Sequence, residues 1–143
     1  MAGYAGDISP QETWDGLTKN DKAQLIDVRT MAEWTFVGLP DLSALGREPI
    51  LLEWQGFPSM QENESFAQTL SAELAKRGAD QSTPLYFICR SGGRSRAAAI
   101  AMTREGYGAC FNVITGFEGD LDNDKHRGTT AGWKADGLPW GQN

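Results

Sequence analysis

The sequence predicts an α/β fold with a parallel sheet. Short apolar runs typical of buried strands alternate along the chain with segments of helical periodicity, and this alternation is characteristic of parallel α/β domains. The chain has 143 residues, which is an ordinary size for one domain. It contains no internal repeat and no linker rich in Pro, Gly or Ser. We therefore expect residues 1–143 to form a single domain.

The first half of the chain is expected to begin with a strand over residues 6–8. Ser9 then precedes Pro10, and Glu12 follows three residues after Ser9, which is the pattern of a capping box at the start of a helix ending near Lys19. The next predicted segments are a buried strand over 23–28, one helical turn over 30–34, a loop over 37–48 and a strand over 49–54.

The second half continues the alternation. Asn63 is expected to cap a helix that runs to Arg77, with Gly78 after its end. The apolar run 84–88 predicts a strand covered on both faces. A helix over 95–105 and a last strand over 109–114 follow, and the remainder is expected to form turns, with Trp133 and Trp140 packed back onto the body.

Composition excludes several classes of protein. Lys and Arg number 13 against 19 Asp and Glu, so the net charge of −6 argues against binding nucleic acid through phosphate neutralisation. No apolar stretch reaches the ~20 residues of a membrane span, and residues 1–10 lack the features of a secretory signal. Two cysteines cannot form a disulfide framework. We expect a soluble cytoplasmic protein that binds neither nucleic acid nor membrane.

The residues most suggestive of chemistry directly follow the apolar run 84–88. Cys89 stands at the predicted strand end, and a polar loop with two glycines leads from it into a helix. Such a loop can turn its N–H groups inward, while the helix N-terminus and two arginines add positive charge. This environment predicts a Cys89 thiolate near neutral pH. The alternative to a reactive cysteine is a structural one, buried beside an ordinary turn. The loop comprises Cys89, Arg90, Ser91, Gly92, Gly93, Arg94 and Ser95.

Three motifs resemble those of the rhodanese (thiosulfate sulfurtransferase) superfamily. The loop 89–95 is similar to its active-site loop. Residues 25–29, with Glu33-Trp34 and residues 38–40, resemble its N-terminal motif, and residues 133–139 its C-terminal motif. The resemblance implies a single-domain, three-layer α/β/α fold whose mostly parallel sheet has about five strands. It further implies that Asp27 and Arg29 brace the active-site loop through hydrogen bonds.

The resemblance also implies an activity. Cys89 would attack the outer sulfur of a small anionic donor such as thiosulfate, and the resulting persulfide would pass its sulfur to cyanide, a thiol or an acceptor protein. Residues 90–95 would bind the donor and stabilise the persulfide, with Arg90 and Arg94 attracting the anion. No metal or organic cofactor is required. The sequence leaves the physiological donor and acceptor and the oligomeric state open.

Two other functions remain open from the residues alone. Cysteine phosphatases and arsenate reductases also combine a cysteine with an arginine, but at the sixth position after the cysteine, where this chain has Ser95 and places Arg94 one position earlier. A non-catalytic rhodanese-like binding or sulfur-carrier module is the second alternative, against which the presence of Cys89 argues. The chain also departs from the family pattern at Asp41 and in an insertion over 120–132, which is a candidate wall of the pocket.

Weaker candidates are assigned structural roles. His126 is expected to be a solvated loop residue, and Cys110 a small buried apolar residue. Asp120, Asp122 and Asp124 imitate the start of a calcium loop, but Lys125 and Ala131 occupy positions that a calcium loop fills with glycine and glutamate. We expect no metal at this insertion. One or two tryptophans are candidates for the mouth of the pocket.

Overall fold

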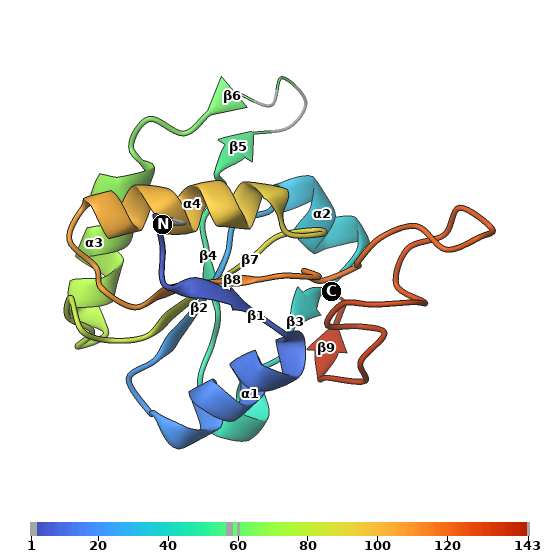
Figure 1. Ribbon diagram of the computed structural model, residues 1–143, viewed down its shortest axis with the longest axis horizontal. Coiled ribbons are helices and arrows are strands. Elements are labelled where there is room, and N and C mark those ends of the chain that lie inside the picture. Colours follow the sequence, from blue (N-terminus) through green and yellow to red (C-terminus); the bar gives the residue numbers. More distant parts are fainter. Residues whose placement is uncertain (1–2, 57–58, 60, 143) are drawn as a thin grey trace.

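The computed structural model describes residues 3–56, 59 and 61–142, and its centre is a five-stranded sheet (Figure 1). Each strand runs parallel to its neighbours. The carboxyl ends of the strands therefore meet at one edge of the sheet, with β7 in the central position. The strand order is β1 (Gly6–Ile8), β8 (Cys110–Val113), β7 (Leu85–Ile88), β2 (Gln24–Asp27) and β4 (Ile50–Leu51).

Helices cover both faces of the sheet, so the predicted three-layer α/β/α fold is confirmed. Figure 1 shows α3 (Phe66–Lys76) and α4 (Gly93–Arg104) on one face and α1 (Pro10–Lys19) on the other. Every residue of β7 is buried, and its side chains alternate between two apolar clusters. Leu85 and Phe87 pack on the α3–α4 side, and Tyr86 and Ile88 on the α1 side.

The predicted start of α1 is confirmed in atomic detail. The Ser9 hydroxyl accepts a hydrogen bond from the Glu12 N–H at 3.1 Å, and the Glu12 carboxylate accepts one from the Ser9 N–H at 3.0 Å. The same reciprocal arrangement, formed by Thr30 and Glu33, begins α2 (Met31–Phe36), the helix predicted as a single turn. These bonds satisfy backbone N–H groups that the first turn of a helix leaves free.

Several predicted boundaries are wrong by a few residues. The helix expected from Asn63 begins at Phe66, because the Asn63 side chain is used to accept the Ser65 N–H and to donate to the Glu53 carbonyl. The helix expected from Ser95 begins at Gly93. The strand expected over 49–54 is reduced to β4, although the N–H groups of Leu52 and Trp54 still donate to the carbonyl groups of Asp27 and Val28.

Short non-local pairings also replace parts of the predicted loops. Within residues 37–48 lie β3 (Leu39–Pro40), which pairs antiparallel with β9 (Trp140–Gly141), and the 3₁₀ helix η1 (Ser43–Leu45). Strands β5 (Gln55–Gly56) and β6 (Gln61–Glu62) pair with each other. The β3–β9 pair fastens the C-terminal segment to the body, where Trp133 is fully buried and Trp140 partly exposed.

A helix needs about 20 apolar residues to cross a bilayer. Over the described residues, no helix is both long enough and apolar enough to do so.

Candidate active site

Cys89 lies directly after the central strand β7, at the carboxyl edge of the sheet. Residues 89–95, here called the Cys89 loop, connect β7 to α4 and bring the predicted site residues together. Gly92 makes this tight connection possible. Its φ of +116° lies in the region that favours glycine, and a Cβ atom there would stand 2.5 Å from the Ile114 carbonyl oxygen. The chain therefore turns at once from Cys89 into the helix.

The turn after β8 forms backbone hydrogen bonds with the Cys89 loop. The Phe117 N–H donates to the Cys89 carbonyl at 2.8 Å, and the N–H groups of Glu118 and Gly119 donate to the Arg90 carbonyl at 3.0 and 3.1 Å. Gly116 permits this approach, because a Cβ atom on it would stand 2.5 Å from the Cys89 carbonyl oxygen. The carbonyl groups of Cys89 and Arg90 are thus both bonded to this turn.

The Cys89 sulfur lies among hydrogen-bonding groups at the N-terminal end of α4. It accepts a hydrogen bond from the Gly92 N–H at 3.1 Å, and the Ser95 hydroxyl oxygen lies 3.2 Å from it. The N–H groups of Gly93 and Arg94, in the first turn of α4, have no acceptor among the described residues. A small cavity of about 180 Å³ opens there, lined by Cys89, Arg90, Ser91, Gly93 and Arg94. This arrangement can stabilise negative charge on a sulfur atom or on a group attached to it.

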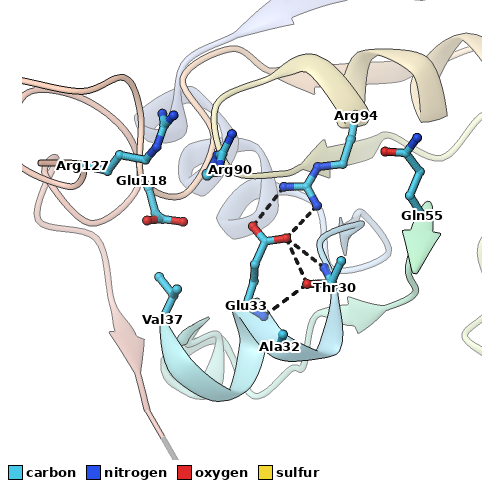
Figure 2. A pocket seen from close by; sticks show the side chains of 9 residues that line it. All are labelled: Thr30, Ala32, Glu33, Val37, Gln55, Arg90, Arg94, Glu118 and Arg127. Carbon is cyan, nitrogen blue, oxygen red and sulfur yellow. Dashed lines mark hydrogen bonds and ion pairs between the residues drawn. The ribbon is translucent and has the colours of Figure 1, made fainter. Parts of the chain in front are cut away.

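Arg94 is already engaged in an ion pair that the sequence analysis did not foresee. Its two terminal nitrogens lie 2.6 and 2.9 Å from the two carboxylate oxygens of Glu33, in the bidentate geometry typical of strong pairs (Figure 2). Burial favours the neutral form of each group. Even so, the partner's hydrogen bonds and charge raise the pKa of Arg94 and lower the pKa of Glu33. The pair therefore stays ionised and places Arg94 beside α2.

A larger cavity of about 560 Å³, here called the mouth cavity, adjoins the Cys89 loop and shares Arg90 and Arg94 with the smaller one. Figure 2 shows arginines and carboxylates facing each other across it. Arg127 comes from the insertion 120–132, so this insertion does wall the cavity. No tryptophan is among the described residues that line it. The lining consists of Thr30, Ala32, Glu33, Val37, Gln55, Arg90, Arg94, Glu118 and Arg127.

Asp27 and Arg29 form a buried ion pair beside the site. Both are fully buried, and Arg29 Nη2 lies 2.7 Å from Asp27 Oδ2 and 2.8 Å from the Gly38 carbonyl oxygen. The guanidinium also lies 4.2 Å from the centre of the Phe117 ring. Within the described chain, neither side chain hydrogen-bonds to the loop, so the predicted bracing bonds are not found. Arg29 instead packs on Phe117, whose N–H donates to the Cys89 carbonyl.

The weaker candidates lie away from the sulfur. Cys110 is buried on β8, where burial raises the pKa of its thiol. His126 is exposed, and Asp122 is occupied in accepting the N–H groups of Asp124 and His126 at 2.9 Å. Among the described residues, no group of three His, Cys, Asp or Glu side chains could hold a metal ion.

Glu33, Glu118, Arg127 and Asn112 are site residues that sequence reasoning missed. Asn112 is the one for which the sequence held a clue, because a polar amide stands in the middle of the apolar segment 109–114. The structure shows it buried and in contact with Ser95. The pairing of Glu33 with Arg94 spans 61 positions and leaves no local pattern.

Comparison with known proteins gives consistent matches over nearly the whole chain. The sequence model of the family described as the STR4 middle domain matches residues 5–143. An uncharacterised protein of Rickettsia conorii is 37% identical over 133 residues, which are 93% of this chain and 94% of that protein. The chloroplastic rhodanese-like domain-containing protein 4 of Arabidopsis thaliana is 25% identical over 92% of this chain, which corresponds to 25% of that longer protein.

A solved structure matches equally broadly. The crystal structure of Rv0390 from M. tuberculosis superimposes with a TM-score of 0.85 at 48% sequence identity. The match covers 98% of this chain and 99% of the other. The arrangement of sheet and helices described above is therefore shared with a protein whose structure has been determined by crystallography.

Proposed function

Because this chain belongs to the STR4 middle-domain family of the rhodanese-like superfamily, we propose that it is a sulfurtransferase in which Cys89 carries the transferred sulfur as a persulfide. The observation that supports this most is the position of the Cys89 sulfur. It accepts the Gly92 N–H at 3.1 Å, and the adjoining cavity of about 180 Å³ offers room for a small addition to the sulfur.

In the proposed reaction the Cys89 thiolate attacks the outer sulfur of thiosulfate. A bond forms between the two sulfur atoms, and the original S–S bond of the donor breaks, so that its electron pair leaves with sulfite. A nucleophilic acceptor then attacks the terminal sulfur of the persulfide and regenerates the Cys89 thiolate. The free N–H groups at the start of α4 would stabilise the negative charge that resides on sulfur in each step.

The mouth cavity supports an acceptor larger than cyanide. Its volume of about 560 Å³ exceeds what a diatomic anion needs, and its charged lining includes both arginines and carboxylates. We therefore place a thiol compound or the sulfur-accepting segment of a partner protein there, with cyanide as a laboratory substitute. Two unpaired cysteines are compatible with a reducing compartment such as the cytoplasm.

The test is the formation of thiocyanate from thiosulfate and cyanide by purified protein, compared with the hydrolysis of an aryl phosphate. We expect thiocyanate formation by the wild type, none by Cys89→Ser and most of it by Cys110→Ser, because Cys110 is buried away from the loop. Turnover of the aryl phosphate alone would indicate a phosphatase. Inactivity of the folded wild type in both assays would favour a non-catalytic module and contradict the proposal.

A further inference from the structure

A chain of hydrogen-bonding groups leads from the protein surface to the Cys89 sulfur. The exposed carboxylate of Asp7 on β1 accepts from the Asn112 side-chain amide at 3.0 Å. Asn112 Oδ1 lies 2.6 Å from the Ser95 hydroxyl oxygen, which in turn lies 3.2 Å from Cys89 Sγ. Asn112, Ser95 and Cys89 are at most 3% exposed, so these inner contacts are sheltered from water.

The chemistry of each group fixes the direction of these bonds. An ionised carboxylate only accepts hydrogen bonds, so the NH₂ group of Asn112 must face Asp7 and its oxygen must face Ser95. An amide oxygen also only accepts, so the Ser95 hydroxyl must donate to it. A hydroxyl has one hydrogen, so Ser95 cannot donate fully to both the Asn112 oxygen, at 2.6 Å, and the Cys89 sulfur, at 3.2 Å.

The sulfur and Asn112 therefore compete for the same hydrogen. While Asn112 holds it, Ser95 turns a lone pair toward Cys89 and can accept from the neutral thiol, but it cannot donate to the thiolate. The Gly92 N–H then remains as the donor to sulfur. Rotation about the Cβ–Oγ bond of Ser95 would move the hydrogen to the sulfur and leave the Asn112 oxygen without its donor.

We propose that Asp7 and Asn112 are positioning residues that hold the Ser95 hydroxyl hydrogen away from Cys89 and so restrain the resting nucleophile. Rotation of the Ser95 hydroxyl toward the sulfur releases this restraint. The proposal deepens the function proposed above, since it assumes that Cys89 is the reacting group. It identifies two residues outside the Cys89 loop as determinants of its reactivity.

The test is the rate at which iodoacetamide alkylates Cys89 at neutral pH, followed by intact mass in a Cys110→Ser background. Leucine is close to asparagine in size and cannot accept a hydrogen bond, so Asn112→Leu frees the Ser95 hydrogen for the sulfur. We expect alkylation to accelerate roughly threefold to tenfold, which is less than the full effect of one hydrogen bond to an ion, because a hydrogen-bonded thiolate is also a weaker nucleophile. Arg94 is unchanged in every variant, so its charge does not contribute to the difference.

A double-mutant cycle separates this role from a loosening of the fold. In a Ser95→Ala background there is no hydroxyl to redirect, so Asn112→Leu is expected to change the rate less than about twofold. Equal acceleration with and without Ser95 would overturn the proposal, and so would an unchanged or slower rate in Asn112→Leu.

Asp7→Asn tests the outer link and covers the case in which Asn112→Leu does not fold. An amide at position 7 can donate, so Asn112 can turn its NH₂ group toward Ser95. We expect faster alkylation than in the wild type, whereas Asp21→Asn, a matched loss of an exposed carboxylate elsewhere, is expected to leave the rate unchanged. An unchanged rate in Asp7→Asn would remove Asp7 from the proposal. Alkylation needs no sulfur donor, so these results stand apart from success or failure of sulfur transfer.

Discussion

Arg94 lies in the Cys89 loop, but its guanidinium is bound at both ends by the Glu33 carboxylate. Its charge is therefore fixed in position and partly neutralised before any donor arrives. Because of this ion pair, the removal of Arg94 has two effects on the site. Truncation takes away a cation near the sulfur and also leaves the Glu33 carboxylate unpaired in the mouth cavity, where it repels an anionic donor.

We therefore expect Arg94→Ala to lower kcat/KM for thiosulfate roughly thirtyfold, which corresponds to a loss of about 2 kcal/mol of transition-state stabilisation. Adding Glu33→Gln to this variant is expected to restore part of the loss, because the unpaired charge disappears. Arg96 is the matched control, since it is exposed on α4 and its guanidinium lies 5.9 Å from the centre of the Tyr4 ring. Steady-state kinetics in which Arg96→Ala is as damaging as Arg94→Ala, with both proteins folded, would refute this assignment.

At the scale of elements, the connection between β7 and α4 depends on one of its two glycines. Gly92 has a positive φ and no room for a Cβ atom, whereas a Cβ atom on Gly93 would meet nothing within 4 Å. Alanine therefore strains the backbone and collides with the Ile114 carbonyl at the first position only.

We expect Gly92→Ala to reduce the free energy of unfolding by about 2 kcal/mol or more, and Gly93→Ala to leave it within about 0.5 kcal/mol. Gly93 is the first residue of α4, where alanine is well tolerated. Urea denaturation of the two variants and the wild type measures both values. Equal losses of stability for the two substitutions would show that the turn does not depend on Gly92.

Elements with local determinants could be predicted from the sequence, and elements with distant partners could not. The Ser9 capping box and the apolar run of β7 were predictable, because their determinants lie within a few residues of each other. The β3–β9 pair could not be predicted, because it joins Leu39 to Gly141 through backbone bonds that leave no pattern in the side chains. The start of α4 was misplaced because Gly92 and Gly93 resemble loop residues, although Gly92 turns the chain directly into the helix.

The site residues also divide into those that a local motif predicts and those that only the fold brings together. The Cys89 loop is contiguous in sequence, so its members could be predicted together from one motif. Glu33, Asn112 and Arg127 reach the site from α2, β8 and the insertion, and only the folded chain brings them there. The hydrogen bonds expected from Asp27 and Arg29 to the loop are not found among the described residues, because both side chains are used by each other and by the Gly38 carbonyl.

For the whole molecule, the pKa shifts predict that the free energy of unfolding decreases at both acidic and alkaline pH. Hydrogen bonds from Ser43, Ser82 and Thr129 lower the pKa values of Asp41, Asp80 and Asp122, respectively. Burial would raise the pKa of Glu33, but Arg94 more than offsets it. Carboxyl groups with a lowered pKa stabilise the fold above their ordinary range, and this contribution is lost as the pH falls through their folded pKa values.

At the alkaline end, burial raises the pKa values of Cys110 and Tyr86. Their stabilising contribution is complete below their ordinary pKa values and is lost as the pH rises through the folded ones. We expect the urea midpoint to fall below about pH 4 and again above about pH 9, with a plateau between. Cys110→Ala is expected to weaken the alkaline decline. A midpoint that is constant between pH 3 and pH 7 would contradict the acidic part of this prediction.

Intact mass after incubation with thiosulfate shows whether Cys89 carries sulfur. We expect the wild type to gain the mass of one sulfur atom and to lose it again when cyanide is added. Cys110→Ser is expected to behave in the same way, and Cys89→Ser to gain nothing. A folded wild type that gains no mass, or a gain that persists in Cys89→Ser, would contradict the account.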